Sequence, residues 1–300
     1  VRKALKGVWI LMRALVTGDL GYIGGNFIKK WEELGHTYVG YDMAYNHEFD
    51  LSMKVKELHI NHKSRPIDVV VHFAAIPRVE FSVQHPNIVM RNNVNSTTNI
   101  LNWAKKEGVP VIYSSSSSVV GNGDGPASPY ALSKYVGELE TLLYNKLYGL
   151  KTVALRYFNV YSYDQVANSE YATVVCNWKK YIEEGKTPFI TGDGEQCRDM
   201  THVDDIVSAN IFCAENIDKD DLWGHWYDIG SGDNISLNEM KEIVLQYFPE
   251  QKFDYVEPRV GDVMLTKADL SKFKSHGWDS KVPLKDGLDS VFETLKREMT

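Results

Sequence analysis

The sequence predicts an α/β fold in which a doubly wound parallel sheet is followed by a smaller C-terminal α/β lobe. Short apolar segments alternate with amphipathic segments of helical length as far as about residue 159. This alternation is typical of parallel strands joined by helices that cover both faces of one sheet. Beyond residue 159 the segments become shorter and glycine–aspartate turns separate them, which indicates a second and less regular lobe.

The apolar segments predict strands, and the amphipathic segments between them predict helices. We expect strands at residues 13–17, 37–41, 69–73, 109–114 and 152–157, and helices at residues 21–34, 87–106 and 129–148. Gly35 and Gly108 follow the first two helical patterns, and glycine is common just after the last turn of a helix.

Three parts of the chain follow from this pattern. Residues 1–11 precede the first strand and are expected to be an N-terminal extension. Residues 12–160 are expected to form a dinucleotide-binding domain, and residues 161–300 mainly a substrate-binding lobe with some segments returning to the main sheet. Open α/β sheets bind their ligands at the carboxyl ends of the strands, so we expect the site at that edge.

Composition excludes several classes of function. The chain has 300 residues, a formal net charge of −7 and no basic stripe, which argues against nucleic acid as the main partner. Cys176, Cys197 and Cys213 are too few and too far apart for a disulfide framework or a zinc site, so we expect no metal. Reduced thiols are the simplest interpretation of these cysteines, and they indicate a cytoplasmic location. No apolar run reaches membrane-spanning length, so we expect no membrane partner.

A glycine-rich turn joins the first expected strand to the first expected helix. Gly18, Gly21 and Gly24 recur at intervals of three in Thr-Gly-Asp-Leu-Gly-Tyr-Ile-Gly. Glycines in this context let backbone amides approach a pyrophosphate at the N-terminus of a helix, which predicts a Rossmann-type dinucleotide site. Asp42 ends the next strand, where a carboxylate binds the ribose hydroxyls of NAD and repels the extra phosphate of NADP. A turn without a ligand is the alternative.

Tyr130 and Lys134 lie four residues apart on the third expected helix, and a run of five serines, Ser114 to Ser118, precedes them. Residues at this spacing share one face of a helix. A nearby ammonium favours the ionised form of a phenol, which would make Tyr130 usable as a base. An isolated pair of this kind also arises by chance, so its context decides its value.

Several blocks, in order, resemble the extended short-chain dehydrogenase/reductase family, and within it the UDP-sugar 4-epimerases that act on UDP-galactose or UDP-glucose and on UDP-N-acetylglucosamine. They are the turn at 17–24, then 72–75, 92–97, 114–121, 128–134, 155–159, 192–199, 202–205 and 258–262. The resemblance extends from Met12 to about Glu293.

The resemblance implies roles residue by residue. Tyr130 corresponds to the catalytic base, Lys134 to its electrostatic partner and Ser116 to the serine that hydrogen-bonds the reacting hydroxyl. The implied NAD contacts are Gly18, Gly21, Tyr22, Ile23, Gly24, Asp42, Asp50, Leu51, Phe73, Ala74, Ala75, Asn93, Ser114, Tyr130, Lys134 and Tyr157. The implied UDP-sugar contacts are Ser116, Asn159, Arg198, Arg259, Asp262 and Thr266.

The residues after Ser116 bear on the reaction. Related 4,6-dehydratases and decarboxylases carry an acidic residue after this serine or threonine, whereas this chain has Ser117 and Ser118. The resemblance therefore favours reversible 4-epimerisation of a UDP-hexose through a transient 4-keto sugar. Alternatives are a UDP-glucuronate 4-epimerase, a 4,6-dehydratase, an NAD(P)-dependent reductase or a non-catalytic nucleotide-sugar sensor. The resemblance also implies a homodimer formed through the helices at 95–106 and 130–147.

Plainer interpretations stay open for individual residues. The serine run can be a polar strand end, and any of its serines can be the working hydroxyl. Asn159 can cap a turn, Arg198 can form a surface ion pair with Asp199, and Arg259 can belong to an ordinary turn. His72, at a strand end in an apolar run, is expected to be structural.

Overall fold

The computed structural model describes residues 11–45, 50–52, 66–77, 79–165, 173–258 and 264–300, and the backbone of residues 4–5 and 8–9. Two compact units divide the chain. Unit 1 comprises residues 1–119, 126–156 and 207–227, and unit 2 comprises residues 120–125, 157–206 and 228–300. Each unit therefore combines segments that are far apart in sequence.

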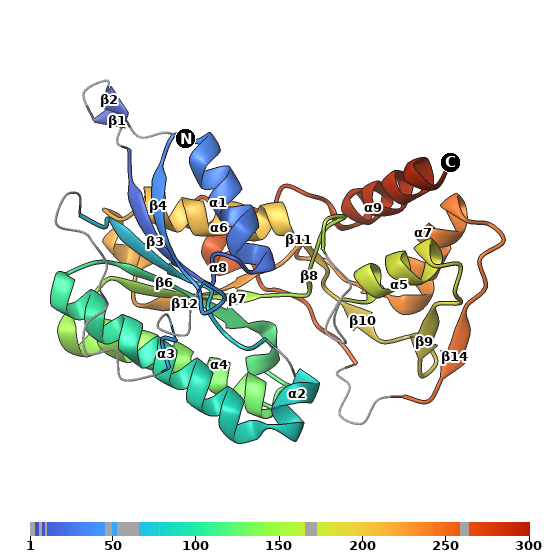
Figure 1. Ribbon diagram of the computed structural model, residues 1–300, viewed down its shortest axis with the longest axis horizontal. Coiled ribbons are helices and arrows are strands. Elements are labelled where there is room, and N and C mark those ends of the chain that lie inside the picture. The colour runs from blue at the N-terminus through green and yellow to red at the C-terminus, as the bar shows by residue number, and fades with distance from the viewer. Residues whose placement is uncertain are drawn as a thin grey trace. The chain divides into compact units, whose positions relative to one another are not determined.

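Within the described residues, a six-stranded sheet forms the centre of unit 1, in the order β12-β7-β6-β5-β3-β4 (Figure 1). The first strand, β3, pairs in parallel with both β4 and β5, and β5 pairs in parallel with β6. Strand order therefore reverses at β3, and such a switch point opens a ligand crevice at the carboxyl ends of the strands. The bounds are β3 Arg13–Thr17, β4 Thr37–Tyr41, β5 Val69–His72, β6 Val111–Ser116, β7 Thr152–Tyr157 and β12 His225–Ile229.

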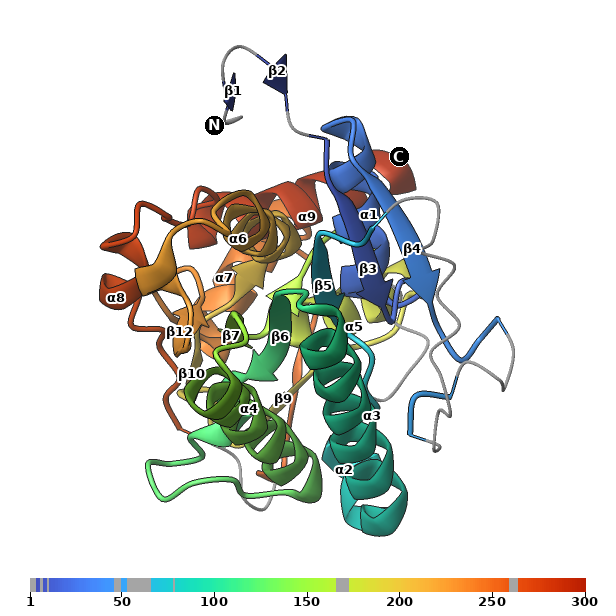
Figure 2. The same cartoon turned by 90° about the vertical axis from the view of Figure 1, so that its left-hand side faces the viewer.

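Helices cover both faces of this sheet. In Figure 1, α1 and α6 lie above the strands, and α3 and α4 lie below them. Figure 2 shows α3 and α4 side by side, and the two helices contact each other along their length. The bounds are α1 Tyr22–Glu33, α2 Val79–Gln84, α3 Pro86–Glu107, α4 Pro129–Tyr148 and α6 Val203–Glu215.

Local sequence signals set the ends of α4, the helix that carries Tyr130. The Ser128 hydroxyl caps its N-terminus by accepting a hydrogen bond from the Ala131 amide, and Pro129 occupies the first turn. Gly149 ends the helix with a φ of 65°, a left-handed conformation that glycine adopts without a steric penalty. Both ends of α4 are therefore specified by residues adjacent to them in the sequence.

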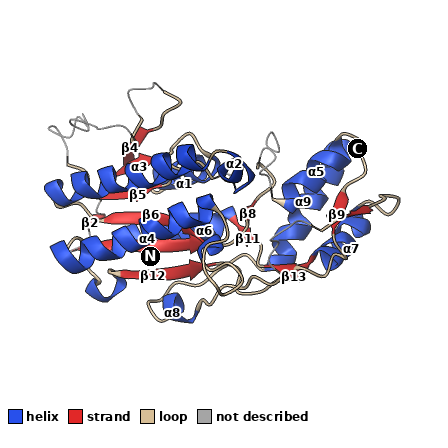
Figure 3. Ribbon diagram, turned by 90° about the horizontal axis from the view of Figure 1, so that it is seen from below, coloured by secondary structure: helices blue, strands red, loops and turns tan. Residues whose placement is uncertain are grey.

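Unit 2 has its own hydrophobic core, in which α5, α7 and α9 pack together around Trp178, Met240 and Phe292. Unit 2 also contains short strand pairs: β8 with β11 and β9 with β14 in parallel, and β10 with β13 antiparallel. Of these strands, β13 contacts α7 (Figure 3). The helix bounds are α5 Val174–Glu183, α7 Leu237–Tyr247, α8 Ser271–Lys274 and α9 Leu284–Met299. The strand bounds are β8 Val160–Tyr161, β9 Phe189–Thr191, β10 Cys197–Arg198, β11 Thr201–His202, β13 Ile235–Ser236 and β14 Asp254–Val256.

The strands predicted at 13–17, 37–41 and 152–157 and the helix at 129–148 are confirmed to the residue. The strand predicted at 109–114 instead covers 111–116. The Val109 amide bonds the Ala104 carbonyl at the end of α3, and Pro110 has no amide hydrogen, so the ladder begins at Val111. Of the expected N-terminal extension, β1 Ala4–Leu5 and β2 Val8–Trp9 pair antiparallel, and most of its other residues lie outside the described chain.

Candidate functional site

The glycine-rich turn packs directly on the loop that follows β5. Gly18 has a φ of 71°, and a Cβ built there would lie 2.7 Å from the Ala74 nitrogen. The amides of Phe73 and Ala74 bond the carbonyl and hydroxyl of Thr17, at 3.0 and 3.3 Å. Any side chain at position 18 would therefore push apart two loops that the cofactor is expected to contact.

The start of α1 is also closely packed on this turn. A Cβ at Gly24 would lie 2.2 Å from the Gly18 carbonyl oxygen, closer than any side chain can approach. Gly21 immediately precedes the first turn of α1, where Tyr22 and Ile23 lie. It has no side chain that could cover the backbone amides of this turn. A cradle of backbone at a helix N-terminus fits the pyrophosphate of a dinucleotide.

The acidic residues expected near the adenosine end of the cofactor lie in short turns. Asp42 follows β4, and its Oδ1 accepts a hydrogen bond from the Ala44 amide at 2.9 Å. Asp50 accepts from the Ser52 amide at 2.8 Å, and Leu51 is buried. A side-chain amide of α3, Asn99, donates to the Leu51 carbonyl at 2.6 Å and thereby ties this segment to the sheet unit.

Asn93 is a buried residue whose side chain joins the β5 loop to α4. Its Oδ1 accepts from the Ile76 amide at 2.8 Å, and its Nδ2 donates to the Ile76 carbonyl at 3.2 Å and to the Ser133 hydroxyl at 2.9 Å. Asn93 thus fixes the loop after Ala75 against the turn of helix that carries Lys134.

Tyr130 and Ser116 form the centre of the predicted catalytic group. The Tyr130 phenol is hydrogen-bonded by the Ser116 hydroxyl, which favours the phenolate, but burial has the larger effect and raises the pKa of Tyr130 above its usual value. The pKa of Tyr130 is therefore raised, whereas a neighbouring lysine was expected to lower it. The Ser118 hydroxyl lies 2.9 Å from that of Ser116, so three hydroxyl groups form one cluster.

Lys134 is only 5% exposed and lies one turn after Tyr130 on α4. Its Nζ donates to the Ser114 carbonyl at 2.7 Å, which joins α4 to β6. Desolvation lowers the pKa of Lys134 to about 7. The structure therefore brings Ser114, Ser116, Tyr130 and Lys134 together at one end of β6.

A buried ion pair that the sequence reasoning missed lies beneath this group. Glu138, one turn after Lys134, accepts two hydrogen bonds from Arg156 at 2.9 and 2.6 Å and a third from the Ser115 hydroxyl at 2.7 Å. Arg156 also stacks over the Trp226 ring at 3.6 Å. The four-residue spacing between Lys134 and Glu138 was a signal for a shared helix face, but only the fold reveals the partner on β7.

His72 has a structural environment, as expected. Its ring nitrogens lie 2.6 Å from the Thr17 hydroxyl and 3.2 Å from the Thr97 hydroxyl. Burial lowers the pKa of His72 to about 3, which keeps the imidazole neutral. The contacts link the glycine-turn strand to α3.

In unit 2, Asn159, Arg198 and Thr266 lie on adjacent segments. The side-chain amide of Asn159 donates to the backbone carbonyl of Asp199 at 2.8 Å. The backbone amide of Asp199 lies 3.2 Å from the Thr266 hydroxyl. The Thr201 amide bonds the Asn159 carbonyl at 3.2 Å. Arg259 and Asp262, expected in the same group, lie outside the described residues. Tyr157, expected at the cofactor, is the buried last residue of β7.

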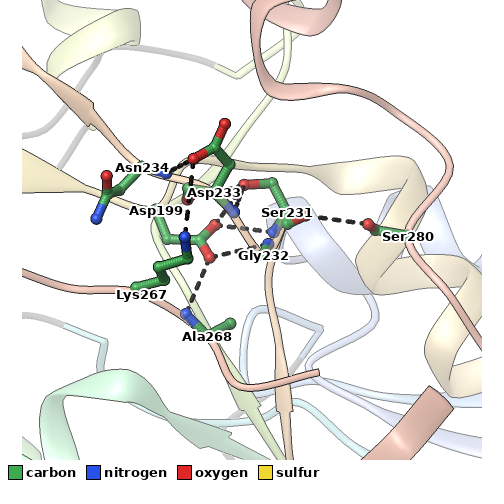
Figure 4. A network of polar contacts seen from close by, with 8 residues as sticks. All are labelled: Asp199, Ser231, Gly232, Asp233, Asn234, Lys267, Ala268 and Ser280. Carbon is green, nitrogen blue, oxygen red and sulfur yellow. Dashed lines mark hydrogen bonds and ion pairs between the residues drawn. The ribbon is translucent and has the colours of Figure 1, made fainter. Parts of the chain in front are cut away.

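Asp199 is a buried hub of hydrogen bonds, and within the described part of the chain its carboxylate forms no surface ion pair with Arg198. Its side chain is 0% exposed and accepts hydrogen bonds from the Ser231 amide and hydroxyl, both at 2.8 Å, and from the amides of Gly232 and Ala268, at 3.1 and 3.0 Å (Figure 4). One carboxylate thus ties together three segments of unit 2, including the one that follows Thr266.

The described residues contain neither a membrane-spanning helix nor a metal-binding cluster. Among the described helices, none is long and apolar enough to cross a bilayer. Across the described residues, no group of three or more histidine, cysteine, aspartate or glutamate side chains is arranged to hold a metal ion.

Residues 14–230 match the profile of the NAD dependent epimerase/dehydratase family. The chain belongs to this family. NAD is its cofactor, and the close contact of Gly18 with Ala74 and the uncapped start of α1 fit the family's dinucleotide site.

Similar proteins include several nucleotide-sugar epimerases. A putative UDP-glucose 4-epimerase of Methanocaldococcus jannaschii is 31% identical, with 94% of this chain and 98% of the relative covered. A UDP-glucuronate 4-epimerase of Thermodesulfobacterium geofontis is 30% identical, with 95% and 96% covered. A solved UDP-N-acetylglucosamine 4-epimerase of Methanobrevibacter ruminantium, in complex with UDP-N-acetylmuramic acid, is 28% identical with a TM-score of 0.83, and 96% of this chain and 99% of that chain are covered.

Proposed function

We propose that this chain is a 4-epimerase of UDP-hexoses that interconverts UDP-glucose and UDP-galactose through a transient 4-keto sugar. The observation that carries the proposal is the hydroxyl cluster around the proposed base. Tyr130 is hydrogen-bonded by Ser116, and the next two residues, Ser117 and Ser118, supply further hydroxyls in place of a carboxylate. Without an acid at this place, elimination of water lacks the proton donor and acceptor that it requires.

In the proposed reaction, NAD held at the Gly18 turn and the start of α1 would supply a reversible hydride acceptor for sugar C4, so that the keto sugar could be reduced again on its opposite face. Tyr130, as the phenolate, accepts the proton of the 4-hydroxyl and later gives it back. Ser116 hydrogen-bonds the same oxygen and holds it near Tyr130. Lys134 supplies positive charge beside the phenolate, and its bond to the Ser114 carbonyl supports the assignment because it orients the ammonium on the Tyr130 face of α4.

In unit 2, we assign the nucleotide-sugar contacts to Asn159, Arg198 and Thr266, with Arg259 and Asp262. Arginine suits a diphosphate because its planar fork can bind two oxygens at once. The hydrogen bonds that connect Asn159, Asp199 and Thr266 support the assignment, since they hold the segments of three of these residues in one place.

The experiment is to incubate the purified protein with UDP-glucose, without added reductant, and to separate the products by chromatography. We expect UDP-galactose to appear and to reach the same equilibrium from either side. The Tyr130→Phe variant should lose the activity and still bind NAD. Accumulation of NADH, or release of a stable 4-keto-6-deoxy sugar, would refute the proposal.

Thr266 bears on which sugars the site accepts. Threonine is small, and its hydroxyl is held near the Asp199 amide and the Asn159 side chain. We propose that the site also admits the N-acetylated pair, UDP-GlcNAc and UDP-GalNAc. Thr266→Tyr should then remove N-acetyl activity and spare hexose activity, whereas equal loss of both would contradict this role.

UDP-glucuronate is the second candidate substrate, because the glucuronate 4-epimerase described above is nearly as similar as the UDP-glucose relative. Comparing kcat/KM for UDP-glucose and UDP-glucuronate in one assay decides between them. Preference for the acidic sugar would replace the proposed hexose substrate and leave the 4-epimerase chemistry intact.

We also propose a homodimer formed through α3 and α4. Leu139, Leu143 and Leu147 are 47%, 48% and 59% exposed and recur every four residues along α4, as an apolar seam between helices does. Light scattering after size exclusion should give twice the chain mass, and Leu143→Glu should give the monomer. A wild-type monomer would refute the dimer.

A further inference from the structure

Ser118 makes two contacts with the same oxygen of the proposed active site. Its hydroxyl lies 2.9 Å from Ser116 Oγ, and its backbone amide lies 3.3 Å from that atom. Both contacts arise because β6 ends at Ser116 and the chain continues as a single 3-10 turn, Ser117–Val119. This turn brings residue 118 back over the hydroxyl of residue 116.

The number of protons on a serine hydroxyl limits how these contacts can be arranged. A hydroxyl has one proton to donate and two lone pairs that accept. A phenolate can only accept, so in the sugar-free site Ser116 uses its single proton on an ionised Tyr130. When the sugar binds, the same proton can turn to the sugar 4-oxygen, which then gives its own proton to Tyr130. The contact of Ser116 with the Ser118 hydroxyl must then be one in which Ser118 donates. The amide and the hydroxyl of Ser118 together occupy the acceptor side of Ser116.

We propose that Ser118 is a positioning residue that holds the Ser116 hydroxyl as a hydrogen-bond donor toward Tyr130. The inference rests on the proposed function in taking Tyr130 as the base. It adds a residue that acts through Ser116 and need not touch the sugar. A serine without these two donors could rotate and accept a hydrogen bond from its surroundings, and the phenolate would lose a donor.

The other titratable groups facing this cluster come from two elements. Lys134 lies on α4, and Tyr113 lies on β6, where it interacts electrostatically with Tyr130. Both are buried, and neither contacts Ser118 in a hydrogen bond found among the described residues. Changing Ser118 therefore leaves the other charges near Tyr130 in place.

The neighbouring serine provides a matched control. Ser117 lies in the same 3-10 turn and is also partly exposed, and in the described part of the chain its hydroxyl makes no side-chain hydrogen bond. Ser117→Ala removes the same atom as Ser118→Ala and causes the same loss of volume. Ser118→Thr keeps the donor hydroxyl at the original position.

The first readout is the titration of Tyr130 itself, taken as the phenolate absorbance of each variant minus that of the same variant carrying Tyr130→Phe. It requires no turnover. Loss of a net hydrogen bond worth about 1.4 kcal/mol corresponds to about one pH unit, so we expect Ser118→Ala to titrate about one pH unit higher. Ser118→Thr and Ser117→Ala should titrate like the unsubstituted protein. An unchanged midpoint in Ser118→Ala overturns the inference.

The second readout is the pH profile of kcat/KM for UDP-glucose. The acid limb of Ser118→Ala should move in the same direction as its titration, with about a tenfold loss of rate below the limb, and Ser118→Thr should restore it. A uniform loss at every pH, unrelieved by Ser118→Thr, would indicate a structural role only and refute the positioning role. If the unsubstituted protein epimerises no UDP-sugar, the proposed function fails, and the phenol titration still decides whether Ser118 orients Ser116.

Discussion

Replacing Asp199 by asparagine tests whether this buried carboxylate holds unit 2 together. The change preserves size and shape, so it leaves no cavity, but it replaces one carboxylate oxygen with an amide that donates. Oδ1 accepts from the amide and hydroxyl of Ser231, and Oδ2 accepts from the amides of Gly232 and Ala268 (Figure 4). At the Oδ2 position the new NH₂ group would face two backbone amides, but at the Oδ1 position it would face only one, that of Ser231, because the hydroxyl there can accept instead.

The magnitude follows from counting those donors. The asparagine takes the orientation in which only the Ser231 amide loses its acceptor, and one buried donor without an acceptor costs about 1–3 kcal/mol of the free energy of unfolding. Loss of the negative charge offsets part of this cost, because burial already raises the pKa of Asp199 and disfavours its ionised form. We therefore expect a loss near the lower end, about 1–2 kcal/mol.

Urea denaturation followed by tryptophan fluorescence measures this loss, since Trp178 is buried in the core of unit 2. Asp233→Asn is the matched control, because Asp233 lies in the loop of Ser231 and Gly232 and its side chain is exposed. The substitution removes the same single negative charge as Asp199→Asn. It should lose less than about 0.5 kcal/mol. In Asp199→Asn, KM for the UDP-sugar should rise more than kcat falls, because Asp199 supports Asn159 and Thr266. Equal stability of the two variants would refute the reasoning.

Three further predictions concern unit 1. Glu138→Gln breaks a buried, bidentate pair with Arg156 and should cost about 3–5 kcal/mol of unfolding free energy in the same urea assay; a loss below about 1 kcal/mol would contradict it. The pKa of Lys134 is about 7 in the folded chain, against 10.5 for an unperturbed lysine, so the unfolded state binds more protons between these values. The free energy of unfolding of NAD-free protein should therefore rise from pH 7 toward pH 10.5, and Lys134→Met should flatten that rise when denaturation midpoints are compared across the range. Gly18→Ala and Gly149→Ala both place alanine at a positive φ, 71° and 65°, but only the first brings Cβ against a neighbour. Gly18→Ala alone should weaken NAD binding by about tenfold or more in a titration, and equal weakening in both variants would show that the contact with the β5 loop is unimportant.

Much of unit 1 could be predicted from the sequence because its signals are local. Alternating apolar and amphipathic segments predicted the strands and helices, and Ser128, Pro129 and Gly149 mark the ends of α4 in the chain itself. The four-residue spacing of Tyr130 and Lys134 predicted a shared helix face, whereas Ser116 was assigned to the same group only through the family resemblance. In unit 2 the elements are short, and their hydrogen-bond partners come from segments far away in sequence.

The sequence by itself determined the α/β alternation, the glycine turn and the Tyr130–Lys134 pair, because each depends on residues a few positions apart. Only the tertiary structure decided the environment of those residues. Burial raises the pKa of Tyr130 where charge proximity alone had suggested the reverse, and Asp199, beside an arginine in sequence, bonds to loops more than thirty residues away. Burial and hydrogen-bond partners depend on which distant segments pack together, and periodicity along the chain does not carry that information.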